Sequence, residues 1–159
     1  MKAAQPPLFE AAPGVWSVVL PWTRAYILSD GVDFTLVDSG TRWDRRRLLA
    51  ACAALRLVRS RCRSVLLTHG HCDHAGNAAF FAEHYGAKIH AHAEERAFLE
   101  TRRTYVPRGW RALRTQGAMF ACGEVFYPVR RRSLGAVLTE GDLVETPAGT
   151  WRVVHTPGH

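Results

Sequence analysis

Short apolar runs alternate with segments of helical period along this chain. The runs at 14–20, 24–28 and 34–37 are rich in β-branched and aromatic residues, and they predict three short strands. Residues 44–57 then carry Leu48, Cys52 and Leu55 at the spacing of one helix face, while arginines fill positions between them. That period predicts an amphipathic helix after the third strand.

The rest of the pattern predicts more strands and helices in alternation. Residues 65–68 form an apolar run in which polar and apolar positions do not alternate, and this is typical of a buried strand in a parallel sheet. We expect helices at 76–85 and 94–100, and further strands at 88–91, 137–138, 142–145 and 151–154, with a turn at 147–149. This order predicts an α/β layered fold, and 159 residues suffice for a single domain, 1–159, with its own core.

Composition agrees with a globular chain and excludes some classes. Hydrophobic residues make up 47% and charged residues 22%, and no apolar run approaches the ~20 residues of a membrane helix. The first residues show no apolar signal core, so we expect a cytoplasmic protein without membrane partners. The four cysteines show no CxxC spacing, which argues against a disulfide framework or a thiolate zinc site.

The net charge of +7 is concentrated in one segment. Residues 102–132 hold eight arginines against one glutamate, interleaved with aromatic residues and without a clean period. One interpretation is a connecting segment whose arginines lie in water. The other is a lid or substrate wall, because long segments of this kind are often functional and positive charge beside a metal would favour an anionic substrate. The sequence leaves both open.

The densest group of candidate ligands directly follows the predicted buried strand. His69, His71, Asp73 and His74 fall within six residues, with Gly70 giving the turn its backbone freedom. Two histidines two residues apart on an extended backbone share one side and can hold one metal ion, while Asp73 and His74 can face a second. Imidazole and carboxylate are the usual ligands of zinc and its neighbours. A helix N-cap at Asp73 beside incidental histidines explains less of this cluster.

A further candidate ligand, His159, ends the chain. Pro157 keeps the residue before it extended, and Gly158 allows the sharp bend that would present this histidine. A catalytic zinc site uses three protein ligands and keeps one open position, so His69 and His71 need a third ligand. We therefore expect His159 to supply it.

The other histidines are expected to be structural. They are His84, on the helix after the cluster, His90 and His92, on one face of a short strand, and His155, before the last turn. Of these, His92 is the best outside candidate for the site. Cys72 lies inside the cluster, where a small turn residue explains it better than a ligand role.

The segment HGHCDHAGN at 69–77, followed by HTPGH at 155–159, resembles the metallo-β-lactamase-fold hydrolase superfamily. VDSG at 37–40 also matches that family's strand-end segment before its first helix. The resemblance covers essentially the whole chain in order. It implies an αββα sandwich with metal ions at one edge, of which this chain would form the N-terminal portion.

The resemblance also implies roles for individual residues. The first metal ion would be bound by His69, His71 and His159, and the second by Asp73 and His74. Asp38 would orient a ligand or loop through hydrogen bonds, as outer partners of metal sites do. An aspartate that simply ends a strand in a turn explains Asp38 equally well.

The family pattern continues beyond position 159, with a bridging carboxylate, a final histidine and a second sheet. We therefore expect a chain lacking the C-terminal half of the sandwich: a fragment, a truncated reading frame, or a chain that needs a partner. Monomers rarely expose more than about 300–600 Å² of contiguous apolar surface, so a homo-oligomer that covers the open sheet face is one expectation.

The leading hypothesis is a metal-dependent hydrolase. A metal-bound hydroxide would attack an ester, thioester, lactone or similar bond in a small-molecule substrate, and Asp73 would orient that water and relay its proton. The expected cofactor is zinc, as one or two ions, with iron or manganese as alternatives. Glyoxalase II-like and lactonase-like activities come first among substrates. The alternatives are a nucleic-acid phosphodiester hydrolase of the same fold, suggested by the basic segment, and an inactive metal-binding fragment.

Overall fold

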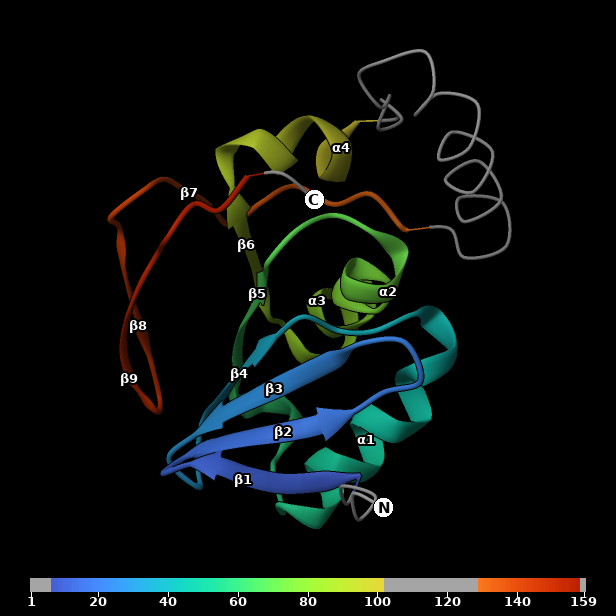
Figure 1. Ribbon diagram of the computed structural model, residues 1–159. Helices are drawn as coiled ribbons and strands as arrows, with labels where there is room; N and C mark the ends of the chain where they lie inside the picture. The colour runs from blue at the N-terminus through green and yellow to red at the C-terminus, as the bar shows by residue number, and fades with distance from the viewer. Residues whose placement is uncertain (1–6, 102–128, 158–159) are drawn as a thin grey trace, which may run out of the picture.

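A seven-stranded sheet with helices packed on one face forms the body of the protein (Figure 1). The computed structural model describes residues 7–101 and 129–157. The strands of this sheet are β1 (Leu8–Ala12), β2 (Val15–Val19), β3 (Arg24–Ser29), β4 (Phe34–Val37), β5 (Cys62–Leu67), β6 (Lys88–His92) and β7 (Ala136–Leu138). The helices are η1 (Arg42–Asp44), α1 (Arg45–Ala54), η2 (Arg59–Arg61), α2 (Cys72–Ala75), α3 (Ala78–Tyr85), η3 (Ala93–Glu95) and α4 (Arg96–Glu100).

The strands lie in sequence order across the sheet, which is antiparallel in its first half and parallel in its second. β1 to β4 form an antiparallel meander, whereas β4, β5, β6 and β7 run parallel. Parallel neighbours need crossover connections, which α1 supplies between β4 and β5, and α2 and α3 between β5 and β6. The carboxyl ends of the parallel strands consequently meet at one edge, where the loops after β4, β5 and β6 can share a site.

The core lies between the sheet and its helices. Buried side chains from the strands and from α1 and α3 meet there, among them Ile27, Leu36, Val65, Ile89, Leu48 and Phe81. Each fully buried side chain of this size stabilises the fold by about 1.5–3 kcal/mol. α3 ends at Tyr85 and is capped by Gly86, whose φ of 72° places it in the left-handed conformation that glycine adopts without strain.

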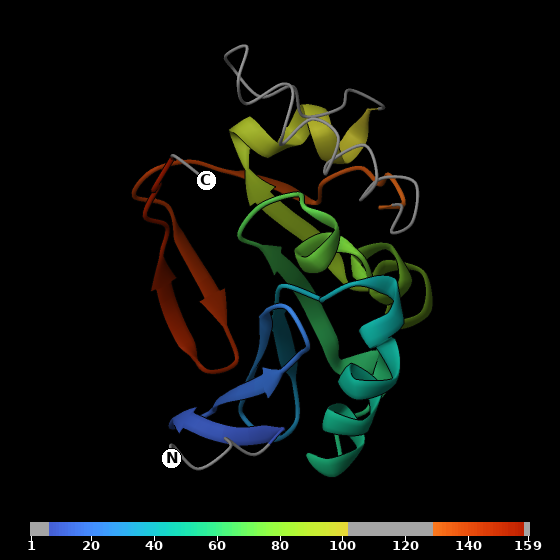
Figure 2. The same ribbon diagram turned by 45° about the vertical axis from the view of Figure 1, so that its right-hand side comes forward.

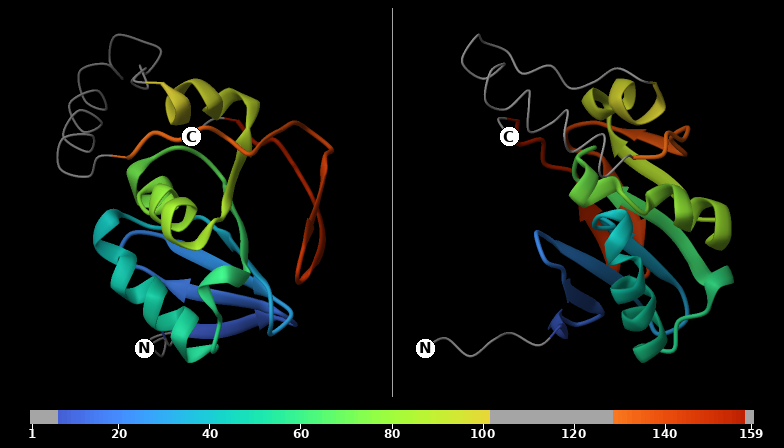
Figure 3. Two further views of the ribbon diagram at one scale, coloured as in Figure 1. Left: turned by 180° about the vertical axis from the view of Figure 1, so that it is seen from behind. Right: turned by 90° about the vertical axis from the view of Figure 1, so that its right-hand side faces the viewer.

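A separate two-stranded hairpin lies on the face of the sheet opposite the helices. Its strands are β8 (Leu143–Thr146) and β9 (Gly149–Arg152), and they pair only with each other among the described residues. Figure 2 shows the hairpin on one side of the sheet and α1 on the other. The right-hand view of Figure 3 looks from the helix side, with the hairpin behind the sheet. The tip of the hairpin reaches the β1–β2 turn, where a Cβ on Gly14 would lie 3.3 Å from that of Ala148.

Most predicted elements are confirmed, and two differ. β1 was not expected, because its residues carry no strand pattern; pairing with β2 makes it a strand. The helix predicted at 76–85 is confirmed as α3, which begins at Ala78, but a separate one-turn helix, α2, precedes it at Cys72–Ala75 and was not expected. α2 is a single turn, too short to show a helical period in the sequence, and it places Asp73 and His74 on a helix rather than in a loop.

The described residues contain no helix with the length and apolar character that a bilayer crossing demands. Of the basic segment, the structure describes only residues 129–132, and the lid interpretation for 102–132 otherwise falls outside the described residues. Within the described part, Arg130 and Arg132 pair with Glu83, and Arg131 stacks its guanidinium over Phe98 at 4.4 Å. These three arginines are thus engaged with α3 and α4.

Candidate metal centre

The loop after β5 brings the imidazoles of His69 and His71 together. His69 Nε2 lies 3.1 Å from His71 Nδ1, and the ring centroids are 4.6 Å apart with the planes at 82°. Nitrogen ligands 2.0–2.1 Å from a tetrahedral zinc ion lie about 3.4 Å from each other. The observed spacing therefore suits two nitrogens that approach one ion from different directions.

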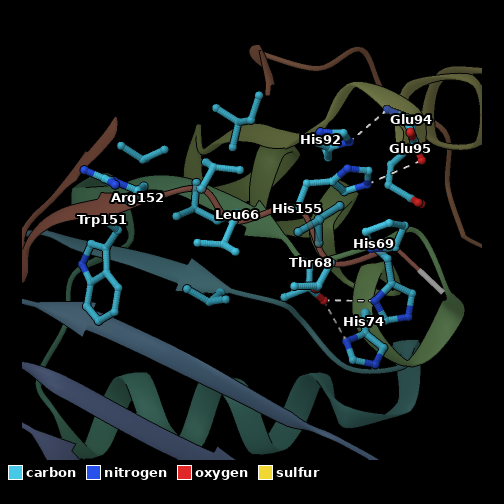
Figure 4. Close-up of a pocket in the computed structure, with 18 of the residues that line it drawn as sticks. Leu66, Thr68, His69, His74, His92, Glu94, Glu95, Trp151, Arg152 and His155 are labelled. Atoms are coloured by element: carbon cyan, nitrogen blue, oxygen red, sulfur yellow. Dashed lines mark hydrogen bonds and ion pairs between the residues drawn. The ribbon is translucent and has the colours of Figure 1, made fainter. Parts of the chain in front are cut away.

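His74 lies beside this pair on α2, and its orientation is fixed by Asp38. The His74 Nδ1–H donates to Asp38 Oδ2 at 2.7 Å, which leaves Nε2 as the nitrogen that can bind a metal ion. This Nε2 lies 3.6 Å from Asp73 Oδ2, and the His74 ring is 4.0 Å from that of His69 (Figure 4). Burial disfavours the charged imidazole, but the hydrogen bond and charge of Asp38, with the charge of Asp73, outweigh it and raise the pKa of His74.

Asp38 also fixes the start of the loop after β5 that carries His69 and His71, which we call the ligand loop. Its Oδ1 accepts a hydrogen bond from the backbone N–H of Thr68 at 2.9 Å, and its Oδ2 accepts one from the Thr68 hydroxyl at 2.8 Å. Asp38 is 4% exposed and has a φ of 58°, a conformation that few residues other than glycine, asparagine and aspartate adopt. Strained backbone of this kind is concentrated at functional sites, and here it aims one carboxylate at two elements.

A second set of polar contacts ties α2 to the segment after β4. The backbone N–H and the hydroxyl of Ser39 both donate to the carbonyl of His74, at 2.6 and 2.8 Å. Asn77 is fully buried and donates from Nδ2 to the carbonyls of Ser39 and Thr41, at 2.8 and 2.5 Å. Every member of this network has a partner, so the network fixes the helix that carries Asp73 and His74.

Gly70 lets the loop pass close to α4. Its N–H donates to Glu95 Oε2 at 2.7 Å, and a Cβ at this position would lie 2.4 Å from the ring of Phe98. Glycine is therefore needed here for close approach, whereas Gly70 does not adopt a positive φ and so does not use the backbone freedom predicted for it. Glu95 was not among the predicted site residues, since it is distant in sequence.

The clustered histidines lie at one end of a cleft between the sheet and the hairpin. The cleft has a volume of about 570 Å³, and its apolar walls include Leu66 from β5 and Trp151 from β9. His69, His71 and His74 line the same cleft. An apolar cleft with a few convergent polar groups is the usual form of a small-molecule site.

Of the predicted ligands, the structure places four, and these meet as two pairs. His69 pairs with His71, and Asp73 with His74. His159 lies outside the described residues. Each pair has the donor chemistry and the spacing for a divalent ion, while no three of these four ligand atoms lie within 4.8 Å of one another.

A third group of ligand atoms lines the cleft and was missed as a group. Among the described residues, His92, Glu94 and His155 are the one set of three whose ligand atoms all lie within 4.8 Å of one another. The sequence predicted structural roles for both histidines, with His92 as the best outside candidate for the site, and it gave no signal for Glu94 as a ligand. No local motif could reveal the group, because its members come from segments more than 60 residues apart.

Comparison with known proteins gives a consistent family. Residues 23–159 match the family model of the metallo-beta-lactamase superfamily. An uncharacterized protein of Mycobacterium leprae, ML0493, is 31% identical over 143 residues, which cover 86% of this chain and 57% of that protein. A hydroxyacylglutathione hydrolase of Anaeromyxobacter dehalogenans is 36% identical over 115 residues, which cover 72% of this chain and 40% of that protein.

Solved structures agree on the fold. BJP-1, a subclass B3 metallo-beta-lactamase of Bradyrhizobium japonicum, superposes with a TM-score of 0.77 at 20% sequence identity. The match covers 98% of this chain and 54% of BJP-1. The chain thus spans about half the length of the proteins it resembles.

Proposed function

The chain belongs to the metallo-β-lactamase superfamily, and from that premise we propose that it carries the metal-binding half of a hydrolase for esters, thioesters or lactones. The observation that supports the proposal most directly is the 3.1 Å spacing of His69 Nε2 and His71 Nδ1, with Asp73 and His74 beside them at the end of an apolar cleft. Hydrolase chemistry in general also agrees with the family and with the similarity to a hydroxyacylglutathione hydrolase.

The chain's own residues would hold and orient the reacting groups. A divalent ion bound by His69 and His71 would supply a Lewis acid and a water of lowered pKa. Asp38 holds the proton of His74 on Nδ1, so that Nε2 is the nitrogen that can coordinate. Asp73, whose Oδ2 lies 3.6 Å from that nitrogen, would accept a proton from a water and pass it to a leaving group.

Acyl thioesters are the first substrate class to test. The relative from Anaeromyxobacter dehalogenans is named for hydroxyacylglutathione, an acylated thiol. The cleft joins apolar walls, including Leu66 and Trp151, with the guanidinium of Arg152, and this combination suits an apolar acyl chain with an anionic end. Zinc is the proposed ion, with iron and manganese as the other ions to test.

The first experiment measures bound metal and hydrolysis together. The chain, the His69→Ala variant and the matched control His84→Ala would be analysed for zinc, iron and manganese and assayed on a thioester, a lactone and an ester. His84 is suitable as a control because its ring contacts that of Phe80 on α3, at a centroid distance of 4.6 Å, and it does not line the cleft.

Of zinc, iron and manganese, we expect one ion to bind most tightly, and we expect the wild-type chain and the His84→Ala control to bind it with equal affinity. Loss of a residue that only hydrogen-bonds to a metal ligand lowers metal affinity by about 10–100-fold. His69→Ala removes a direct ligand, so the affinity for that ion should fall by more than this. Any hydrolysis should fall with it and should be abolished by a chelator. Equal metal content in all three folded chains would overturn the assignment of the site.

A further inference from the structure

His92, Glu94 and His155 form a compact group of donors in the cleft, on the same side of it as His69 and His74 and away from Trp151 (Figure 4). His155 Nε2 lies 3.6 Å from Glu94 Oε2, and the rings of His92 and His155 stack at 3.9 Å with planes 15° apart. The backbone N–H of Glu94 donates to His92 Nδ1 at 3.4 Å. That contact leaves Nε2 of His92 for another partner.

The three residues reach this point from two parts of the fold. His92 ends β6, and Glu94 follows it in η3. His155 lies beyond β9, on the segment that leaves the hairpin, and its backbone N–H donates to Glu140 Oε2 at 2.5 Å. The group therefore joins the central sheet to the hairpin across the cleft.

We propose that His92, Glu94 and His155 bind a divalent metal ion of the zinc class at a site separate from the one formed by His69, His71, Asp73 and His74. Two imidazoles and one carboxylate are an established zinc donor set, which leaves a fourth position for water. This second site uses none of the ligands of the first, so either can fail without the other.

Metal binding requires a small rearrangement that the surroundings allow. Ligand atoms around a tetrahedral zinc ion lie about 3.4 Å apart, so donors now within 4.8 Å must close slightly. Two parallel stacked rings cannot both point a nitrogen at one ion, so one imidazole must turn. The Glu94 side chain is 69% exposed and that of His155 is 28% exposed, which leaves both room to move.

Metal binding at this site would cross-link the segment after the hairpin to the sheet. The ion would cross-link His92 and Glu94, carried by β6 and η3, to His155, carried by the segment after β9. An ion that binds only the folded arrangement stabilises it by mass action. Amide hydrogens of β8 and β9 should therefore exchange more slowly when the site is filled.

The test uses the full chain carrying His69→Ala and His71→Ala, so that the first site keeps only Asp73 and His74 of its four ligands. Zinc binding to this background would be measured by calorimetry, then again after adding Glu94→Gln, His155→Ala or the control His84→Ala. Hydrogen exchange of β8 and β9 would be followed in each chain with and without zinc. Circular dichroism would establish that each chain is folded.

We expect one zinc ion to bind the background chain, with at least about tenfold weaker binding after Glu94→Gln or His155→Ala and no change after His84→Ala. Zinc should slow exchange in β8 and β9 only where the site is intact. Absence of zinc binding to the folded background chain would overturn the proposal, as would equal binding in all variants. Should the background chain fail to fold, loss of one zinc equivalent on Glu94→Gln in the otherwise wild-type chain decides the same question.

Discussion

The carboxylate of Asp38 connects β4, the ligand loop and α2, because it accepts hydrogen bonds from Thr68 and His74 at the same time. Replacing it with alanine leaves buried donors without a partner, at a cost of about 1–3 kcal/mol each. Asparagine keeps the shape and tolerates the positive φ of 58°. We therefore expect Asp38→Ala to lower the urea midpoint clearly and Asp38→Asn much less.

The two Asp38 variants separate stability from metal binding. An asparagine side chain carries no charge to orient and support His74, so metal affinity should fall by about 10–100-fold even where stability is kept. Zinc titration of the folded Asp38→Asn chain measures this. Wild-type metal affinity in that variant would mean that Asp38 stabilises the turn after β4 but does not support metal binding.

The cysteines offer a second test at the scale of single residues. Cys52 and Cys62 are 3% and 4% exposed, and burial raises the pKa of each thiol to about 12. Because the thiolate is the reactive form, both should resist iodoacetamide at pH 8 in the folded chain and react in urea. Mass spectrometry of peptides measures the labelling. Rapid labelling of either thiol without denaturant would show that this part of the core opens readily.

At the scale of elements, patterns that repeat within one segment were readable from sequence. The apolar run at 65–68 predicted the parallel strand β5, and Gly86 predicted the end of α3. β1 was missed because its strand character comes from pairing with β2. The candidate ligands at 69–74 could be predicted because they are adjacent in sequence, whereas Glu94 and His155 are brought together only by the fold.

The break between α2 and α3 has its own physical cause. A Cβ on Gly76 would lie 2.6 Å from the carbonyl oxygens of Cys72 and Gly40 and 2.8 Å from the backbone nitrogen of Arg42. These neighbours are backbone atoms, which cannot turn aside as a side chain can. Gly76 is thus required for the close approach of α2 to the segment after β4.

We expect Gly76→Ala to destabilise the chain by about 1–3 kcal/mol or more and to weaken metal binding, because α2 carries Asp73 and His74. Gly86→Ala is the matched control: its Cβ would meet nothing within 4 Å, and its cost is the strain of the left-handed conformation, about 1–2 kcal/mol. Urea unfolding and zinc titration measure the two effects. Equal metal affinity in Gly76→Ala and Gly86→Ala would show that α2 does not depend on this contact.

At the scale of the whole molecule, the helices cover one face of the sheet, while the opposite face borders the cleft and the hairpin. This division follows from the sequence only in part. The family resemblance predicted a layered fold, which the structure and the comparisons confirm, with the chain spanning about half of its relatives' length. The position of the hairpin could not be predicted, because the described residues show no strand pairing between it and the sheet.

The hairpin should consequently be the least protected part of the described sheet structure. An isolated pair of strands is marginally stable in water, and Leu143 and Trp151 are 65% and 42% exposed. In chelator-treated protein, amides of β8 and β9 should exchange before those of β5, which is paired on both sides and packs against α3. Hydrogen exchange with mass spectrometry measures both in one sample, with β5 as the internal control. Protection of the hairpin equal to that of β5 in metal-free protein would mean that packing across the cleft, rather than an ion, holds the hairpin to the sheet.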